Sequence, residues 1–314
     1  MGKGRRDLNV YFGRAKTLTA DVWEIVTNAH GARTGLIRQY AFDATSAITP
    51  TVEGQAGGSR FLVRTRDRYI GRGMFNGGFE LDDMCRAIDL VTEARGQGFL
   101  KGRTFVDVGA NIGNTSVPAC RAWGASRVVS VEPEPENFKL LRCNAILNDV
   151  DERIVAVNAA VTNKPGTVRL ELSPNNFGDH RVRITDAPGD WGENKRLTVE
   201  VPGIRLDDLL RAHDVPIDDV GLLWLDTQGH EGHVLDSAPE LLASNVPVVT
   251  EFWPYGLRRS DGIDLFSDIV AGSFETIIDV RSGESVSADK LQLLFDRYGF
   301  DAGGYTDLAL LPGN

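Results

Sequence analysis

Short apolar segments alternate with helical ones from about residue 100 onward, and this alternation restricts the chain to few architectures. The apolar segments are 104–110, 127–133, 153–161, 220–226 and 246–252. They are nearly continuous runs of β-branched and aliphatic residues, as in strands that are buried on both faces. The segments between them have helical patterns, such as 114–125, 135–149 and 229–244. We therefore predict an α/β fold, with a mostly parallel sheet that is covered by helices on both faces.

One region interrupts the alternation. The sequences TVRLELS (167–173) and RLTVEVPGI (196–204) predict two further strands, and a long polar loop separates them. Pro118 must lie in the first turn of its helix, and Pro239 must bend or end the helix in which it lies.

The first part of the chain is weakly patterned, and we predict that residues 1–99 form a mostly helical extension ahead of a main domain at 100–314. Thr19–His30 is expected to form a short helix with Thr19 as its cap. Gly54–Ser59 is expected to be a turn, and residues 61–75 have the composition of a strand. Residues 81–98 have a helical pattern that ends in glycine.

Composition excludes several classes of protein. The net charge is −10, and no basic block follows the first six residues, which disfavours polymeric nucleic acid as a partner. No window approaches eighteen uninterrupted apolar residues, so we expect no membrane span. The three cysteines show no C-x-x-C spacing, which argues against a zinc site or a disulfide framework and favours a cytoplasmic protein. The sequence leaves open whether the chain forms a homodimer.

Two glycines, Gly109 and Gly113, follow the first strand of the main domain, in the sequence TFVDVGANIGNTS (104–116). Ligands of open α/β sheets bind beyond the carboxyl ends of strands, and small residues there let a ligand approach the backbone. The spacing is G-x-N-x-G, not the G-x-G-x-x-G of nicotinamide dinucleotide enzymes. Asp107 stands two residues before Gly109, where it would repel a pyrophosphate but suit an ammonium group. This pattern points to S-adenosylmethionine.

The ends of the next two strands also carry candidate ligands. Glu132 ends its strand 19 residues after Gly113, about where this architecture binds ribose hydroxyls. Asn158, Ala159 and Ala160 end the third strand, where small residues can flank an adenine ring.

A fourth strand end combines two acids, two histidines and a glutamine in the sequence LDTQGHEGH (225–233). A neutral imidazole can take a proton from a hydroxyl nucleophile near pH 7, and a carboxylate can hold the imidazole. We predict His230 as the base, with Glu231 or Asp226 orienting it. His233, one helical turn further, is expected on a helix surface.

Together these segments resemble the FkbM family of S-adenosylmethionine-dependent methyltransferases. The resemblance runs from about Asn76 to Trp253 and rests on FVDVGANIGNTS, VEPEPENFKLLRCNAILND, VNAAVTNKPGTVRLEL, LLWLDTQGHEGHVLDSA and VVTEF. It implies a Rossmann-like class I methyltransferase fold with seven strands. It also implies methyl transfer, mostly to hydroxyl oxygens of sugars, polyketides and other small molecules.

The resemblance and the strand-end motifs together predict the cofactor site. Its expected residues are Glu80, Asp107, Gly109, Ala110, Asn111, Gly113, Asn114, Glu132, Pro133, Asn158, Ala159, Ala160 and Asp226. Phe79 and Glu80, in NGGFELDD, are candidates to close over the cofactor. Family members often carry a lysine two residues before the aspartate of the fourth motif and an acid two residues after it, where this chain has Trp224 and Gln228.

The most favoured function is O-methylation of a small-molecule hydroxyl by direct in-line transfer, without a metal. One alternative uses a divalent cation held by Asp226, Glu231 and Glu251. A nicotinamide-dependent oxidoreductase and a binding module without catalysis are alternatives from other classes. A base-nitrogen methyltransferase is disfavoured, because the strand ends read LDTQ and EFWP where such enzymes carry an N-P-P-Y-like sequence.

Overall fold

The computed structural model describes residues 30–313, and its side chains from residue 37 onward. The helix that we predict at Thr19–His30 lies outside the described residues, except for its last residue. No helix within residues 30–313 has the length and apolar character that a membrane crossing needs.

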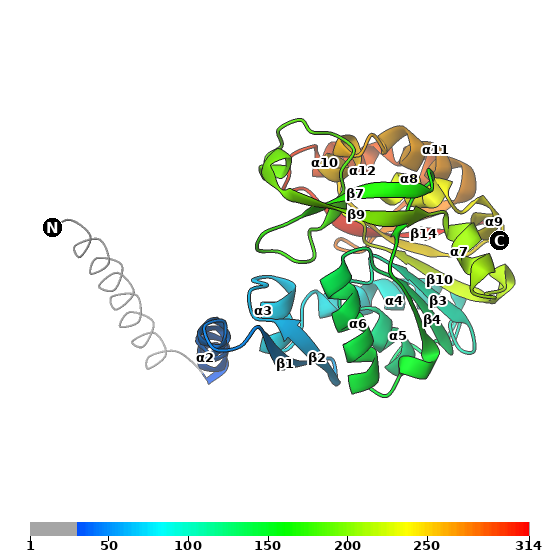
Figure 1. Ribbon diagram of the computed structural model, residues 1–314. Coiled ribbons are helices and arrows are strands. Elements are labelled where there is room, and N and C mark those ends of the chain that lie inside the picture. The colour runs from blue at the N-terminus through cyan, green and yellow to red at the C-terminus, as the bar shows by residue number, and fades with distance from the viewer. Residues whose placement is uncertain (1–29, 314) are drawn as a thin grey trace.

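The described residues form one large sheet with the strand order β13-β12-β14-β11-β10-β3-β4-β5 (Figure 1). Its strands are β3 (Thr104–Val108), β4 (Arg127–Val131), β5 (Ile154–Val157), β10 (Val220–Leu225), β11 (Val248–Phe252), β12 (Thr276–Asp279), β13 (Ser285–Ser287) and β14 (Thr306–Leu311). The first five are parallel to one another, and β14 is antiparallel between β11 and β12. This confirms the predicted α/β fold. The prediction of seven strands was wrong by one, because the three-residue strand β13 adds to the edge beyond β12.

The chain changes direction across the sheet between β3 and β10. Strands β3, β4 and β5 follow one another toward one edge, and β10 then returns to the other side of β3. Such a reversal opens a crevice beyond the carboxyl ends of the two strands. The loops after β3, β4 and β10 therefore meet in one place.

Helices cover both faces of the sheet. Their bounds are α5 (Ser116–Arg121), α6 (Pro135–Leu147), α7 (Leu206–Ala212), α8 (Glu231–Asp236), α9 (Pro239–Leu242), α10 (Pro254–Arg259), α11 (Ile263–Ser273) and α12 (Gln292–Tyr298), with 3-10 turns at Asp151–Arg153, Glu193–Lys195, Ile217–Asp219 and Ala288–Lys290. Pro118 is the third residue of α5, as predicted, and Pro239 begins the separate helix α9.

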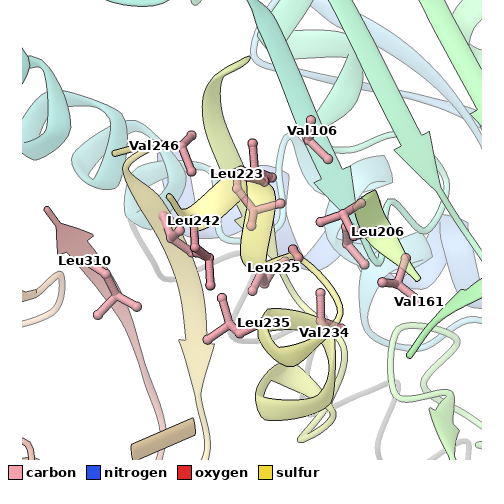
Figure 2. Packing of buried hydrophobic residues seen from close by; sticks show 14 of the residues in the cluster. Val106, Val161, Leu206, Leu223, Leu225, Val234, Leu235, Leu242, Val246 and Leu310 are labelled. Carbon is pink, nitrogen blue, oxygen red and sulfur yellow. The ribbon is translucent and has the colours of Figure 1, made fainter. Parts of the chain in front are cut away.

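Alternate strand residues pack into different clusters. Val106, Leu223 and Leu225 join the cluster that Val234 and Leu235 of α8 contribute to (Figure 2). Phe105 and Trp224 join the opposite cluster, which includes side chains from α4, α5 and α6. The two-residue period of a strand thus decides which face of the sheet each side chain stabilises.

A second sheet has the order β6-β9-β7-β8, with β6 at Ala160–Val161, β7 at Gly166–Leu172, β8 at Arg181–Val182 and β9 at Leu197–Ile204. The strands β7 and β9 confirm the prediction for residues 167–173 and 196–204. The third predicted strand of the main sheet is shorter than expected, because its last residues turn into β6 and pair with β9.

The extension consists of α2 (His30–Thr45), β1 (Thr51–Ala56), β2 (Ser59–Arg64), α3 (Ile70–Asn76) and α4 (Leu81–Arg95). The turn expected at Gly54–Ser59 is shorter, since β1 continues to Ala56. A Cβ at Gly54 would lie 2.7 Å from the Met74 carbonyl oxygen, so this glycine serves the close packing of β1 on α3. Within residues 61–75, β2 ends at Arg64 and the remainder forms α3, which the strand-like composition did not predict.

The extension packs on the main domain, with α4 against β14 and β2 beside α6 (Figure 1). Phe61, Val63 and Met84 belong to the same buried cluster as Phe105 and Val117. Two amides of β2 donate hydrogen bonds to α6 and its cap: the Leu62 amide to Asn144 at 2.7 Å, and the Arg60 amide to Asn148 at 2.9 Å. We keep residue 99 as the proposed boundary between the extension and the main domain.

Candidate functional site

The loop after β3 is held in a conformation that its glycines permit. The amides of Gly109 and Ala110 both donate to the Val131 carbonyl, at 2.9 and 3.0 Å. Gly109, Asn111 and Gly113 have φ values of +92°, +50° and +87°. A Cβ on Gly109 would lie 1.7 Å from the Asp226 carbonyl oxygen. The glycine therefore allows the loop after β3 to touch the end of β10, and any side chain would separate them.

Glu132 fixes the next part of this loop. Its carboxylate accepts hydrogen bonds from the Asn111 amide and the Glu134 amide, both at 2.8 Å. The residue is 4% exposed, and this burial raises the pKa of its carboxyl to about 8 despite the two amide donors. Asn158 supports the same strand end by donating to the Glu132 carbonyl at 2.8 Å.

These loops line an inner cavity, whose empty space is about 510 Å³ with the part that is open to solvent included. It is lined by Gly109, Asn111, Glu132, Pro133, Asn137, Ala160, Val161, Leu170, Phe177, Gly178, His180, Arg181, Val182, Asp226, Thr227 and His230. Seven of these residues were predicted from the sequence as cofactor-binding or catalytic, and they come from four different strand ends.

Asp107 does not line the inner cavity, contrary to the prediction that it binds the cofactor directly. Its carboxylate accepts a short hydrogen bond from the Ser116 hydroxyl, which lies 2.7 Å from the Ser130 hydroxyl. Asp107 is 1% exposed, and burial raises its pKa to about 7. The carboxylate is thus enclosed beneath the loop, where it joins β3 to α5.

Other predicted residues support the cavity without lining it. Ala110, Gly113, Asn114, Asn158 and Ala159 are absent from its wall. A Cβ on Gly113 would lie 2.9 Å from the Leu141 side chain, so this glycine permits packing against α6. Asn114 and Ala159 are buried.

The insert at residues 173–195, between β7 and β9, is a candidate from the sequence to shape the acceptor pocket, and in the structure it also contributes a wall of the inner cavity, which was not predicted. The Phe177 carbonyl accepts hydrogen bonds from the side chains of Asn111 and Asn137, at 3.2 and 2.8 Å. The Arg64 guanidinium lies 3.8 Å from the centre of the Phe177 ring. Asn137 was detectable, because it is the third residue of a helix that Glu134 caps. Nothing local marks Phe177.

Glu231 organises the loop after β10. One of its carboxylate oxygens accepts hydrogen bonds from the Thr227 amide and hydroxyl, both at 2.9 Å, and from the Gly229 amide at 3.2 Å. It is fully buried, and burial raises its pKa to about 7. Glu231 lies in the wall of neither the inner cavity nor the outer cleft described below, so the structure places it as a support for the loop.

His230 is buried beside this loop with a 2% exposed side chain, and its ring stacks on His233 at 4.4 Å between centroids. Neither ring nitrogen has a hydrogen-bond partner among the described residues. The prediction that Glu231 or Asp226 orients His230 was therefore wrong. Burial, with a smaller contribution from His233, lowers its pKa to about 3. His233 is itself buried, and its Nε2 donates to the Ser260 carbonyl at 2.8 Å, so its expected surface position was also wrong.

An outer cleft of about 1380 Å³ adjoins the inner cavity. Aromatic and polar side chains line it, among them Phe79, Trp191, Trp253 and Tyr305, with Glu80, Asn176, Gln228 and Glu251. Gly178, Arg181 and Asp226 belong to the walls of both the inner cavity and the outer cleft. Glu80 and Phe79 thus lie on the cleft, and the expectation that they close over the cofactor stays a prediction.

Asp226 stands at this junction with two polar neighbours. The Gln228 side-chain amide donates to Asp226 at 2.7 Å and to Glu251 at 3.1 Å. Burial raises the pKa of Asp226 to about 6 and raises that of Glu251 well above its ordinary value. Gln228 therefore holds two carboxyl groups together that would repel each other if both were ionised.

The residues proposed for a divalent cation do not form a ligand set. Within residues 37–313, no group of three or more His, Cys, Asp or Glu side chains is arranged to hold a metal ion. Of the three candidates, Asp226 and Glu251 line the cleft while Glu231 is committed to the loop. Trp224, where family members often have lysine, stacks on Trp123 at 6.1 Å in the core.

Comparisons with known proteins match one family model and two curated methyltransferases. Residues 107–272 match the family model described as the methyltransferase FkbM domain. The chain is 29% identical over 178 residues to methyltransferase sdnD of Sordaria araneosa. That alignment covers 49% of this chain and 68% of that protein. It is 24% identical over 157 residues to 2-O-methyltransferase NoeI of Sinorhizobium fredii, covering 47% of this chain and 62% of that protein.

A solved structure of methyltransferase FkbM from Methylobacillus flagellatus KT is 16% identical, with a TM-score of 0.40. The alignment covers 67% of this chain and 43% of that one. The chain thus spans less than two thirds of NoeI and less than half of the M. flagellatus protein.

Proposed function

Since this chain belongs to the methyltransferase FkbM domain family, we propose that it transfers a methyl group from S-adenosylmethionine to a hydroxyl oxygen of a small molecule. The observation that carries the proposal is the position of Asp226, which forms part of the wall of both the inner cavity and the outer cleft. A methyl group has to pass from donor to acceptor at such a junction.

The inner cavity has features that fit the donor. Gly109 lines the cavity, and its lack of a side chain brings the loop after β3 against the end of β10. Glu132 stands where this architecture binds ribose hydroxyls, and we place the adenine ring beside Pro133 and Ala160. The buried side-chain oxygen of Asn111 lacks a protein partner among the described residues, so it is available to a donor group of the ligand.

S-adenosylmethionine supplies a methyl group on a positively charged sulfur, so the protein has to position the acceptor and remove one proton. We assign proton removal to Asp226, which would take the hydroxyl proton while the new C–O bond forms and the C–S bond breaks. Its pKa of about 6 keeps it mostly ionised at neutral pH and still basic enough to accept the proton.

His230 is less suited to that role. It lines the inner cavity but not the outer cleft, so an acceptor in the cleft does not reach its ring. With a pKa near 3, it is a weak base. The burial that keeps His230 neutral therefore argues against our sequence-based assignment of this residue as the base.

The acceptor would occupy the outer cleft. Trp253 forms part of its wall and is fixed by donating from its indole nitrogen to the Ala302 carbonyl at 3.0 Å. Aromatic faces beside amide and carboxyl groups suit a compound with both apolar and hydroxyl-bearing parts. A small molecule, not nucleic acid or membrane, is the acceptor that we propose, and a cytoplasmic location is part of the same proposal.

A transfer assay with S-adenosylmethionine that carries a labelled methyl group tests the function. Pools of hydroxyl compounds are offered, and products that retain the label are identified by mass spectrometry. At saturating cofactor, Asp226→Asn should lower turnover by about two to four orders of magnitude. Asp219→Asn, a change of the same kind at an exposed position, should leave turnover unchanged. Binding of a nicotinamide cofactor without any binding of S-adenosylmethionine would contradict the proposal and favour an oxidoreductase.

A further inference from the structure

We propose that His230 binds the carboxylate of the methionine-derived tail of S-adenosylmethionine through an imidazole N–H. This inference rests on the proposed function, since it assumes that the inner cavity holds that cofactor. It assigns His230 to cofactor binding and not to proton transfer.

The first argument is the unmet hydrogen-bonding capacity of His230. The side chain is 2% exposed, and both of its ring nitrogens lack a partner among the described residues. Leaving a buried polar group unsatisfied costs about 1–3 kcal/mol. His230 forms part of the wall of the inner cavity, so a ligand in that cavity is a partner that the geometry offers.

The second argument is the order of the strands. Glu132 follows β4, Gly109 follows β3, and His230 follows β10, and these three strands are adjacent in that order. Since neighbouring strands lie about 4.8 Å apart, the loops that carry Glu132 and His230 are separated by roughly 10 Å across the sheet. If Glu132 binds the ribose, then His230 lies at the other end of the cofactor, which is the amino-acid tail.

The third argument is charge. The tail carries one ammonium group and one carboxylate, and the carboxylate needs a hydrogen-bond donor from the wall of the inner cavity. Arg181 is the cavity's guanidinium group, and its Nε and Nη1 also lack a hydrogen-bond partner among the described residues. Its charge, however, is balanced by Asp179, Glu171 and Glu193 at ion-pair distances. His230 has no such ion pair among the described residues, and both of its ring nitrogens lack a partner.

The ring is also held in place before any ligand arrives. It stacks on His233, which is itself fixed by the Ser260 carbonyl at 2.8 Å and lies 3.2 Å from the Asn163 side-chain oxygen. Burial and the neighbouring imidazole keep His230 uncharged, so it adds no repulsion toward the positively charged sulfur. A neutral ring presents one donor nitrogen and one acceptor nitrogen.

The test compares two ligands on two variants by isothermal titration calorimetry. S-adenosylmethionine carries the tail carboxylate, and its decarboxylated form lacks only that group. His230→Phe removes both nitrogens and keeps a planar ring, while His230→Gln keeps an amide donor. His213→Phe is the same change at a histidine outside both cavities.

We expect His230→Phe to lower the affinity for S-adenosylmethionine by roughly ten- to a hundredfold, which is the usual range for a hydrogen bond to a charged group. The affinity for the decarboxylated ligand should fall by less than about threefold, because the hydrogen bond to His230 is already absent from its complex with the wild-type protein. His230→Gln should recover part of the loss, and His213→Phe should match the wild type. Circular dichroism checks that each variant is folded, and His230→Gln and His230→Leu give the same comparison if His230→Phe does not fold.

Equal losses for both ligands would overturn the inference, as would an unchanged affinity for S-adenosylmethionine. Failure of the wild-type protein to bind either ligand would instead overturn the proposed function.

Discussion

Two walls of the inner cavity are built in different ways. The loop after β3, residues 109–115, obtains its shape from backbone conformation: Gly109 at φ +92° and Gly113 at φ +87° allow turns that other residues resist. The insert between β7 and β9, residues 173–196, obtains its shape from side-chain pairs. The first wall is encoded within a few residues, and the second is encoded by contacts between residues far apart in the chain.

The insert is organised around one buried acid. Glu171 is 2% exposed, and its carboxylate lies 3.1 Å from Arg183 Nε and 3.3 Å from Arg196 Nη1. Arg181 approaches the same carboxylate at 3.6 Å, and its guanidinium lies 4.6 Å from the centre of the Trp253 ring. Buried charges of this kind are tolerated only while each has a partner. The comparison therefore predicts that the first wall fails through sterics and the second through unpaired charge.

The largest expected effect is that of Gly109→Ala. The new Cβ would lie 1.7 Å from a backbone oxygen, which cannot move without shifting β10. We expect a loss of about 3 kcal/mol or more in the free energy of unfolding, together with loss of cofactor binding. Urea unfolding and calorimetry measure the two effects.

Gly96→Ala is the matched control for the conformational cost. Gly96 has nearly the same φ, +93°, but nothing lies within 4 Å of its Cβ position. Similar losses for Gly96→Ala and Gly109→Ala would contradict the steric explanation of the first wall.

Glu171→Gln tests the second wall. It leaves Arg183 and Arg196 with less compensating charge in a buried place, and breaking such a pair costs about 3–5 kcal/mol. We expect the loss to approach that of Gly109→Ala, as measured by urea unfolding. Glu200→Gln, an exposed change on the neighbouring strand β9, should cost less than about 0.5 kcal/mol. Equal free energies of unfolding for Glu171→Gln and Glu200→Gln would show that the ion pairs do not stabilise the insert.

This difference also explains what the sequence predicted. Gly109, Asn111 and Glu132 were predicted correctly as part of one site, because each lies at a strand end that hydrophobic pattern and turn residues reveal. Phe177 and Arg181 were not predicted, since they reach the cavity through the fold of the insert and no local pattern marks them.

Asp107 was misplaced for a reason that the sequence contains. Its neighbours Val106 and Val108 point to one cluster, and Phe105 points to the other. By the two-residue period, Asp107 lies on the same side as Phe105, beneath α5. That alternation therefore predicts a buried position for Asp107, in contrast to Asp226, which lines the cavity.

Glu132→Gln tests whether the residues of the first wall bind the cofactor. The substitution keeps the shape of the side chain but replaces one acceptor oxygen with an amide group. Leaving a buried ribose hydroxyl without its acceptor costs about 1–3 kcal/mol, so the affinity for S-adenosylhomocysteine should fall roughly five- to a hundredfold. Glu136→Gln changes an exposed acid four residues away and should have no effect on calorimetric affinity. An unchanged affinity in Glu132→Gln would remove this residue from the cofactor site.

A further expected effect, spread over about two pH units, concerns the acid at the junction. Burial raises the pKa of Asp226 from 3.8 to about 6, so between these values the folded protein holds a proton that the unfolded chain releases. Stability should therefore fall as pH rises through this window, and the contribution is fully lost above about pH 6. Relative to Asp226→Asn, which does not titrate, the wild type should lose up to about 1.4 kcal/mol per pH unit.

Urea unfolding of both proteins across that pH range measures the difference. A constant difference between the wild type and Asp226→Asn would mean that Asp226 is ionised in the folded protein throughout, contrary to its buried position at the junction.

The most direct test of the whole account is a crystal structure with S-adenosylhomocysteine. We expect the ribose hydroxyls at the Glu132 carboxylate, the adenine beside Pro133 and Ala160, and the amino-acid tail between Gly109 and His230. Density for the ligand in the outer cleft alone, or in the inner cavity with its tail toward Glu132, would contradict the account.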